Sequence, residues 1–236
     1  MGKERFDKII ANQFNVSRKE ARLAIRKGKA SVDGMTLNDP SAIVEVEADI
    51  VFDGQALDYK KYIYILMNKP KGVLSASSDK NRKTVVDLVP NEWHRNGLFP
   101  VGRLDKDTTG FLIITDDGDF AHRAIAPNKN VFKTYEVLLD GDITDDMIEI
   151  FSKGVVLADG TKCKSSILKR LGQNRAEIKI SEGKYHQIKR MFGTVSLGVN
   201  ELKRTAMGDL KLPDNLREGE CILLNDQEIG QIFHKC

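Results

Sequence analysis

GRLDKDTTGFLIITDDGD, residues 102–119, places the apolar run FLII at 111–114 between two acidic segments. An apolar run of this length is typical of a buried β-strand. We expect the DDGD segment to close the strand and to start a helix over DFAHRAIA, with Asp117 or Asp119 near its N-terminus. The acidic segments supply five aspartates to a chain whose formal net charge is +3: Asp105, Asp107, Asp116, Asp117 and Asp119.

Three interpretations of this acidic stretch compete. The first is an EF-hand-like calcium loop starting at Asp105, but a strand runs through it, GLFPVGRL precedes it where a helix is required, and its twelfth position lacks Glu. The second is an aspartyl phosphatase, whose D-x-D-x-T pattern matches DKDTT, but VGRL is too short and polar to be the strand such a motif follows. The third is a single catalytic aspartate whose neighbours shape the backbone.

The composition is that of a globular protein with one large or two unequal domains. The 236 residues are 41% hydrophobic and 30% charged, and no apolar run is long enough to span a bilayer. The start, MGKERFDKII, is not a secretory signal. Cys163, Cys221 and Cys236 lack metal-ligand spacing, which is typical of reduced thiols in the cytosol. We expect a cytoplasmic protein with no metal site and no membrane partner.

Charge is distributed unevenly along the chain. Residues 1–30 carry nine Lys and Arg against three acids, whereas residues 31–59 carry seven acids and no Lys or Arg. Residues 160–211 again carry an excess, with twelve basic residues against four acidic ones. Two separate basic blocks indicate either a polyanion bound at two places or two solvated faces.

The first basic block predicts two short helices and a hairpin. Apolar residues recur at helical spacing over residues 6–14. Ser17 and Glu20 form a capping box at the start of the second helix, and Gly28 suits its end. The Asp-Gly pair at 33–34 between β-prone runs predicts a tight hairpin.

Three arginines of the second helix, Arg18, Arg22 and Arg26, are four residues apart and share one face. Like charges on one face repel each other. We therefore expect an anionic group opposite them, and RNA is the favoured one.

Three short motifs in this block resemble the S4 RNA-binding module. They are R-x-D-K at 5–8, S-R-x-x-A at 17–21 and IRKGKASVDG at 25–34, and the resemblance covers residues 1–58. In that family the second helix and the adjoining loop face RNA. The resemblance therefore implies four RNA-binding residues here: Arg18, Lys19, Arg22 and Arg26.

The linker over residues 59–61 separates this module from a larger domain over residues 62–236. The larger domain alternates strands and short helices without a regular βαβ repeat. This order predicts an α+β fold with a mixed, mainly antiparallel sheet flanked by helices.

Five motifs in this larger domain resemble those of pseudouridine synthases, in the same order. They are the stretch from Gly102 to Gly118, NKPKG at 68–72, KTY at 133–135, EGKYHQIKRMF at 182–192 and ELKRTAMGDL at 201–210. Together with an S4 module, the pattern is similar to the branch that modifies ribosomal RNA, and YHQIKRMF is most similar to the small-subunit enzymes. Large-subunit enzymes usually carry Arg where Lys189 stands.

The resemblance implies a catalytic set of Asp105, Tyr135 and Lys189. Asp105 matches the essential aspartate, Tyr135 would face the target base, and Lys189 would pair with Asp105 and keep it ionised. The reaction moves the bond at ribose C1′ from N1 to C5 of the uracil without net redox change, so we expect no cofactor. Three roles stay open for Asp105: stabilising charge at C1′, attacking C1′, or removing a proton from C2′.

Arg103 projects to the same side as Asp105 if this segment is extended. It would hold RNA phosphate, fill the space left by a flipped base, or form an ion pair with Asp107 or Asp119. Five further residues are candidate clamps on the RNA backbone: Lys69, Lys71, Arg190, Lys203 and Arg204.

The expected partner is small-subunit ribosomal RNA or its assembly particle, bound by a monomer. Two alternatives remain: a pseudouridine synthase acting on large-subunit ribosomal RNA, and a non-catalytic ribosome-assembly factor that only binds ribosomal RNA. The second alternative leaves the set Asp105, Tyr135 and Lys189 without a use.

Overall fold

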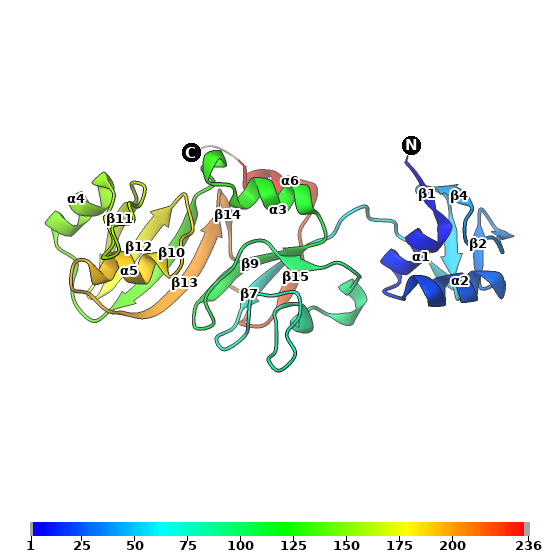
Figure 1. The fold of residues 1–236 in the computed structure, drawn as a ribbon, viewed down its shortest axis with the longest axis horizontal. Coiled ribbons are helices and arrows are strands. Elements are labelled where there is room, and N and C mark those ends of the chain that lie inside the picture. Colours follow the sequence, from blue (N-terminus) through cyan, green and yellow to red (C-terminus); the bar gives the residue numbers. More distant parts are fainter. Residues whose placement is uncertain (1, 234–236) are drawn as a thin grey trace. The chain divides into compact units, whose positions relative to one another are not determined.

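The computed structural model describes residues 2–233 and divides into two compact units (Figure 1). Unit 1 comprises Met1–Ile63 and Pro90–Leu98, and unit 2 comprises Tyr64–Val89 and Phe99–Cys236. The loop segment over residues 90–98 belongs to unit 1, and side-chain hydrogen bonds attach it there. Arg95 Nη2 donates to Lys60 O at 2.9 Å, and Asn96 Nδ2 donates to Val16 O at 3.2 Å.

Unit 1 contains the two helices and the hairpin that its sequence predicts. Its elements are β1 (Lys3–Arg5), α1 (Phe6–Gln13), α2 (Arg18–Arg26), β2 (Ala30–Val32), β3 (Met35–Thr36), β4 (Ile43–Glu45), β5 (Ile50–Phe52) and β6 (Gln55–Ala56). Strand β1 pairs with β4, and the other four strands form a sheet in the order β3-β2-β5-β6. Ser17 and Glu20 form the predicted capping box, and Asp33 and Gly34 turn the β2–β3 hairpin with φ values of 49° and 77°.

Unit 2 is built on a nine-stranded sheet of the described residues (Figure 1). Its central order is β11 (Ile167–Gly172), β12 (Arg175–Ile180), β10 (Lys133–Leu139), β13 (Val199–Met207), β9 (Thr109–Thr115), β7 (Tyr64–Lys69) and β15 (Cys221–Leu223). Strand β14 (Leu210–Lys211) pairs with β13, and β8 (Phe99–Pro100) pairs with β9. All pairs are antiparallel except β13–β9, so the predicted mixed, mainly antiparallel sheet is confirmed.

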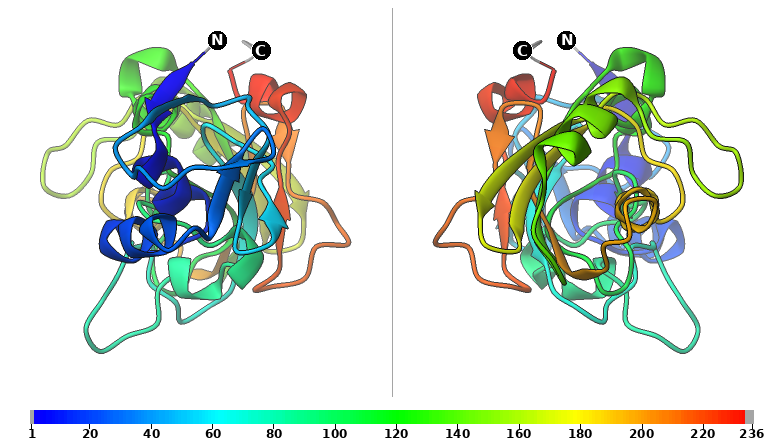
Figure 2. Two further views of the ribbon diagram at one scale, coloured as in Figure 1. Left: turned by 90° about the vertical axis from the view of Figure 1, so that its right-hand side faces the viewer. Right: turned by 90° about the vertical axis from the view of Figure 1, so that its left-hand side faces the viewer.

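Two pairs of helices flank this sheet. Figure 1 shows α3 (Gly118–Ile125) and α6 (Asp226–Gln231) over the central strands, where Phe120 and Phe233 stack edge-on with centroids 5.6 Å apart. Helices α4 (Asp145–Lys153) and α5 (Gln187–Gly193) meet through Phe151 and Phe192 at 5.0 Å. Figure 2 shows α5, drawn in gold, to one side of the strands. Three 3₁₀ turns complete the elements: Val86–Leu88, Asn91–Trp93 and Pro127–Lys129.

The acidic stretch at 102–119 folds around β9. Residues 111–114 of this strand are almost wholly buried, as an apolar run between two layers requires. Asp117 caps α3 by accepting a hydrogen bond from Phe120 N at 3.0 Å, and it accepts another from the Tyr64 hydroxyl at 2.6 Å. Because Thr109–Thr115 is a sheet strand, the aspartates on either side of it do not wrap around a common calcium position.

The two cysteines within the described residues, Cys163 and Cys221, are free thiols, and Cys236 lies outside these residues. Over residues 2–233 the helices are too short or too polar to cross a membrane.

Candidate active site

Unit 2 contains a cavity of about 390 Å³ that brings together residues far apart in the sequence. Strands β10, β12 and β13 form its floor, and the loop before β9 and the segment before α5 form its walls. Its polar and charged lining comprises Arg103, Asp105, Thr108, Lys133, Tyr135, Glu182, Lys184, Tyr185, His186, Gln187, Lys189 and Arg204. The three residues expected to form a catalytic set therefore line one cavity.

Asp105 lies in the loop that connects β8 to β9, and this loop is held from both ends. Ser75 Oγ donates to Leu104 O at 3.0 Å and accepts from Leu104 N at 3.1 Å. Thr108 N donates to Asp105 O at 3.1 Å and closes a tight turn. The carboxylate is thus carried by a short segment whose backbone is fixed by hydrogen bonds on either side.

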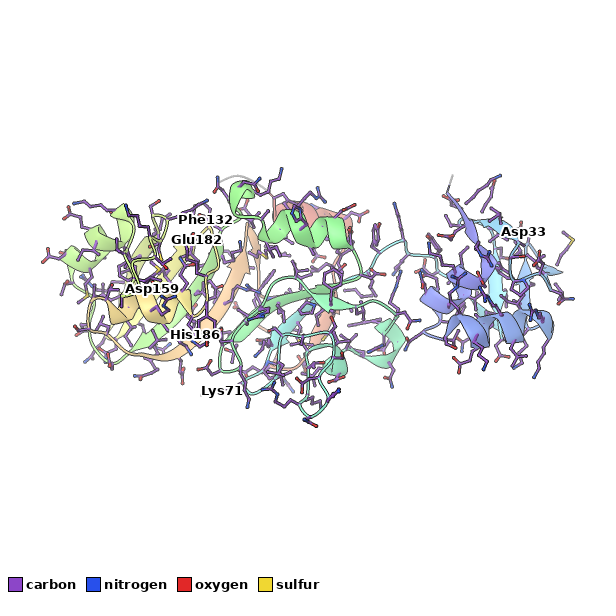
Figure 3. The ribbon with its side chains drawn as sticks, viewed as in Figure 1. Asp33, Lys71, Phe132, Asp159, Glu182 and His186 are labelled. Atoms are coloured by element: carbon purple, nitrogen blue, oxygen red, sulfur yellow. The ribbon has the colours of Figure 1, made fainter. Side chains whose placement is uncertain are left out.

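Lys69 is buried and stabilises this loop by hydrogen bonds. The sequence predicted it to be a clamp on RNA, and its burial corrects that expectation. Its side chain is fully buried at the end of β7. Its ammonium donates to Thr108 O and Pro70 O, both at 3.0 Å. Burial lowers the pKa of Lys69 to about 8, against the opposing effect of Asp107 and Asp105. Lys71, labelled in Figure 3, is exposed, and its role as a clamp stays a prediction.

Lys189 pairs with Asp107 and not with the predicted Asp105. The Lys189 Nζ to Asp107 Oδ2 distance is 2.5 Å, and this hydrogen bond lowers the pKa of the Asp107 carboxyl. The reason is the turn over residues 105–108, which presents the two carboxylates differently to α5. Asp105 instead lies beside the imidazole of His186, whose Nε2 is 3.5 Å from Asp105 Oδ1.

His186 lies at the cavity wall in a strained conformation. Its φ of 47° is left-handed, which is uncommon for a residue other than glycine. Its ring stacks on Tyr185 with centroids 3.9 Å apart, and Tyr185 is 71% exposed. A left-handed residue that touches the candidate carboxylate is typical of a functional site, where surrounding structure holds the strain.

Glu182 fixes the segment that leads into α5 (Figure 3). Its carboxylate accepts from Lys164 N at 2.9 Å, from Gln187 Nε2 at 2.8 Å and from Lys184 Nζ at 2.6 Å. These bonds connect the chain before α5 to the loop that precedes β11, and so they set where His186 and Lys189 lie.

The floor of the cavity holds Tyr135, Lys133 and Arg204. Lys133 and Tyr135 are two residues apart on β10 and therefore share one face of the sheet. Arg204 of β13 is the direct cross-strand partner of Tyr135. All three side chains are more than nine-tenths buried, with exposed fractions of 6% for Lys133, 8% for Tyr135 and 4% for Arg204.

Arg204 corrects a second expectation, because its guanidinium is internal. Its Nε donates to Phe111 O of β9 at 2.7 Å, so the side chain crosses from β13 to the neighbouring strand under the cavity. The adjacent Lys203 points to the opposite face and is exposed, as strand alternation requires. Of this pair, only Lys203 is exposed, and its contact with RNA backbone stays a prediction.

The remaining predicted RNA-binding residues are at least partly exposed. Arg103 lines the cavity with an exposed side chain, and within residues 2–233 it forms no ion pair with Asp107 or Asp119. Arg190 pairs with Asp159 at 2.5 Å. In unit 1, Lys19 and Arg26 are exposed on α2.

The anionic group opposite the arginines of α2 is a protein side chain. Asp7 of α1 is fully buried and accepts hydrogen bonds from Arg18 Nη2 at 2.9 Å and Arg22 Nε at 2.7 Å. Arg5 Nε adds a third at 3.1 Å. The three arginines therefore share a face for an internal reason, whatever their role toward RNA. Among them, Arg26 forms no ion pair within the described residues of unit 1.

Sequence reasoning gave Lys133 and His186 no specific role at the site. Strand alternation over KTY was a usable signal for Lys133, since it places this residue on the face of Tyr135. No pattern in the sequence signals the left-handed backbone of His186.

Comparison with known proteins identifies the family. The model of the RNA pseudouridylate synthase family matches residues 63–194, and that of the S4 domain matches residues 4–50. The chain belongs to the RNA pseudouridine synthase family. Both resemblances seen in the sequence are thereby confirmed, and the cavity in unit 2 lies within the part of a pseudouridine synthase that the family match covers, extended by strand β13.

Relatives of this pseudouridine synthase match nearly its whole length. An uncharacterised RNA pseudouridine synthase of Bacillus subtilis is 40% identical over 95% of this chain and 96% of its own. Ribosomal small subunit pseudouridine synthase A of Escherichia coli is 37% identical over 97% of this chain and 99% of its own. A crystal structure of a pseudouridylate synthase has 31% identity and a TM-score of 0.69, covering 97% of this chain and 99% of that one.

Proposed function

We propose that this pseudouridine synthase isomerises a uridine of small-subunit ribosomal RNA, with Asp105 as the catalytic carboxylate. The observation that carries the proposal is the convergence of Asp105, Tyr135 and Lys189 on one cavity of about 390 Å³. The similarity to ribosomal small subunit pseudouridine synthase A of Escherichia coli supports the choice of RNA.

The chemistry requires an anionic group at the sugar. When the bond between uracil N1 and ribose C1′ breaks, C1′ loses electron density, and a carboxylate is suited to stabilise or trap it. Asp105 is held on a fixed turn at the cavity wall, and His186 lies beside it. The carboxylate is therefore already in place when the substrate binds, and the loop does not have to rearrange.

A uridine within structured RNA reaches such a cavity only by leaving its stack. The ring of Tyr135 on the floor offers a surface for the uracil to stack on, and its hydroxyl is a candidate for proton transfer at C5. Arg103, an exposed residue of the cavity lining, is a candidate to hold a neighbouring phosphate or to fill the vacated space in the RNA. Lys189 supports this arrangement through Asp107.

RNA outside the cavity is bound by exposed cations. In unit 1 these are Lys19 and Arg26 of α2, together with the half-exposed ends of Arg18 and Arg22. In unit 2 they are Lys71, Lys203 and the partly exposed Arg190, which also pairs with Asp159. Their contacts are electrostatic and position the RNA without reading its bases.

The test is incubation of unmodified small-subunit ribosomal RNA with the wild type, Asp105→Asn and Asp119→Asn, followed by nucleoside analysis. Asp119 is a matched control because it is an exposed aspartate of the same stretch, in the first turn of α3 and outside the cavity. We expect the wild type and Asp119→Asn to form pseudouridine and Asp105→Asn to be slower by about a thousandfold or more.

Three outcomes contradict the proposal. Equal activity of Asp105→Asn removes the role of Asp105. Modification of large-subunit RNA alone assigns the other substrate. Binding of ribosomal RNA by the wild type without any isomerisation indicates a non-catalytic assembly factor.

A further inference from the structure

Two cations lie under the cavity without a partner of opposite charge. Lys133 and Arg204 are each more than nine-tenths buried and both line the cavity floor. Arg204 uses Nε for the hydrogen bond to Phe111 O, whereas its buried Nη2 has no hydrogen-bond partner. Within residues 2–233, no hydrogen bond or ion pair joins the Lys133 ammonium to an acidic side chain.

The acids that line the same cavity have other partners. Glu182 is occupied by the Lys164 amide, Gln187 and Lys184. Asp105 lies beside His186 on the wall. Burial lowers the pKa of Lys133 to about 8, and the nearby cations Arg204 and Lys164 add to this effect. All three disfavour the charged form of the amine.

Such an arrangement is costly unless an anion completes it. A buried unpaired charge is destabilising, and two of like sign repel each other as well. Enzymes use preorganised charges of this kind where the opposite charge develops during the reaction, because the interaction is then strongest in the transition state.

We propose that Lys133 and Arg204 bind the uracil ring and stabilise the negative charge that it gains when the glycosidic bond breaks. This inference rests on the proposed function. The electron pair of the N1–C1′ bond leaves with N1, and the resulting anion shares its charge with O2 and O4. After the ring turns, C5 bonds to C1′ through the electrons of the C5=C6 bond, which makes the ring neutral. The proton on C5 then leaves to a base or to solvent while N1 takes up a proton, so the net change is the transfer of one proton from C5 to N1.

A uracil ring fits the floor better than an RNA phosphate does. Ile180, Leu202 and Met207 line the cavity around the two cations, and the ring of Tyr135 lies on the same face. A flat heterocycle can bury its faces against these apolar groups while its oxygens reach the cations. A phosphate would have to lose its hydration against the same apolar surface, and two cations would offset only part of that cost.

The experiment measures, under single-turnover conditions, how fast the original nucleoside is consumed by Lys133→Met, Lys133→Arg and the wild type, on the small-subunit RNA with either uridine or 5-fluorouridine at the modified position. Consumption is the readout because 5-fluorouridine carries no proton on C5 and cannot form pseudouridine. Fluorine withdraws electrons and stabilises the ring anion, so it replaces part of what the cation supplies. We expect Lys133→Met to convert uridine on the order of 100-fold more slowly. The rate of Lys133→Met should fall less on 5-fluorouridine than on uridine, and its RNA affinity should stay within about twofold of the wild type. Lys133→Arg should regain part of the rate.

Three results overturn the inference. Equal slowing of both substrates shows that Lys133 does not act on the leaving ring. A parallel loss of RNA affinity and of its salt dependence shows that Lys133 holds a phosphate. A wild-type rate in Lys133→Met shows that it does neither. Arg204→Lys, which keeps the charge but loses the second donor arm, repeats the comparison if Lys133→Met does not fold.

These results are distinguishable from a failure of the proposed function. If the wild type does not isomerise the RNA, or if Asp105→Asn is fully active, the proposed function fails before Lys133 is tested. If the wild type is active and Asp105→Asn is not, the Lys133 variants test this inference alone.

Discussion

Asp7 shows how a single buried residue holds unit 1 together. Burial raises the pKa of its carboxyl, but hydrogen bonds from Arg5, Arg22 and Arg18 outweigh burial and hold the pKa well below the ordinary value. The folded state therefore binds a proton less readily than the unfolded state. The stabilisation is complete above pH 4–5, where the unfolded carboxyl is ionised, and it is lost as the pH falls toward the pKa of the folded state.

Asp7→Asn is expected to lower the free energy of unfolding by about 3 kcal/mol at pH 7, because three guanidinium groups lose their anion. Urea denaturation of both proteins measures this at pH 7 and again at pH 3. The difference between them should shrink at pH 3, where the carboxyl of the unfolded wild type is already largely protonated and part of the stabilisation is lost. A difference that stays constant over this range contradicts the assigned ionic role.

Residue types and motif order predicted which side chains gather at the cavity, but not how they pair. Lys189 was expected to meet Asp105 and instead binds Asp107, because a turn closed by one backbone hydrogen bond decides which carboxylate faces α5. Lys69 and Arg204 were expected to be clamps on the RNA backbone, a role that requires exposed side chains. Their burial follows from positions at a strand end and at the one parallel pair of the sheet, which depend on contacts between distant segments.

Gly110 shows how an element depends on a close approach between strands. It lies at the start of β9 opposite Arg204 of β13, with φ at +99°. A Cβ at this position would lie 2.2 Å from the carbonyl oxygen of Arg204, and that oxygen is backbone and cannot swing away. The parallel pair and the placement of Arg204 under the cavity therefore both require glycine.

Gly110→Ala is expected to destabilise unit 2 by about 3 kcal/mol or more, because steric overlap and an unfavourable φ add. Thermal and urea unfolding measure the loss. Gly118→Ala is the control, since Gly118 has open space around its Cβ position and lies in the first turn of α3. Its effect should stay within about 1 kcal/mol. Equal stability of the two variants would show that β9 and β13 can separate at no cost.

Elements with local signals were predictable and those with only distant ones were not. A few neighbouring residues are enough to predict the capping box of α2, the Asp-Gly hairpin and the apolar run of β9. The segment 90–98 carries no such signal. It belongs to unit 1 because Arg95 and Asn96 reach backbone carbonyls far away in the sequence.

Across the whole molecule, RNA binding and isomerisation have separate physical requirements. The cavity and every candidate catalytic residue lie in unit 2, whereas the basic helix α2 lies in unit 1. Charge on α2 should therefore change how strongly RNA is held and how that affinity depends on salt. It should leave the rate of the bound complex unchanged.

Reversal of the two exposed cations of α2, in Lys19→Glu with Arg26→Glu, tests this division. We expect weaker RNA binding and a slope of log affinity against log salt that is smaller by about two, because about two phosphate contacts are lost. The rate at saturating RNA should stay within about twofold, since no group at the cavity changes. The control reverses Lys3 and Lys60, which are exposed cations of unit 1 outside α2. If the control weakens binding equally, net charge and not the α2 face binds the RNA; if the saturated rate falls, unit 1 takes part in the reaction itself.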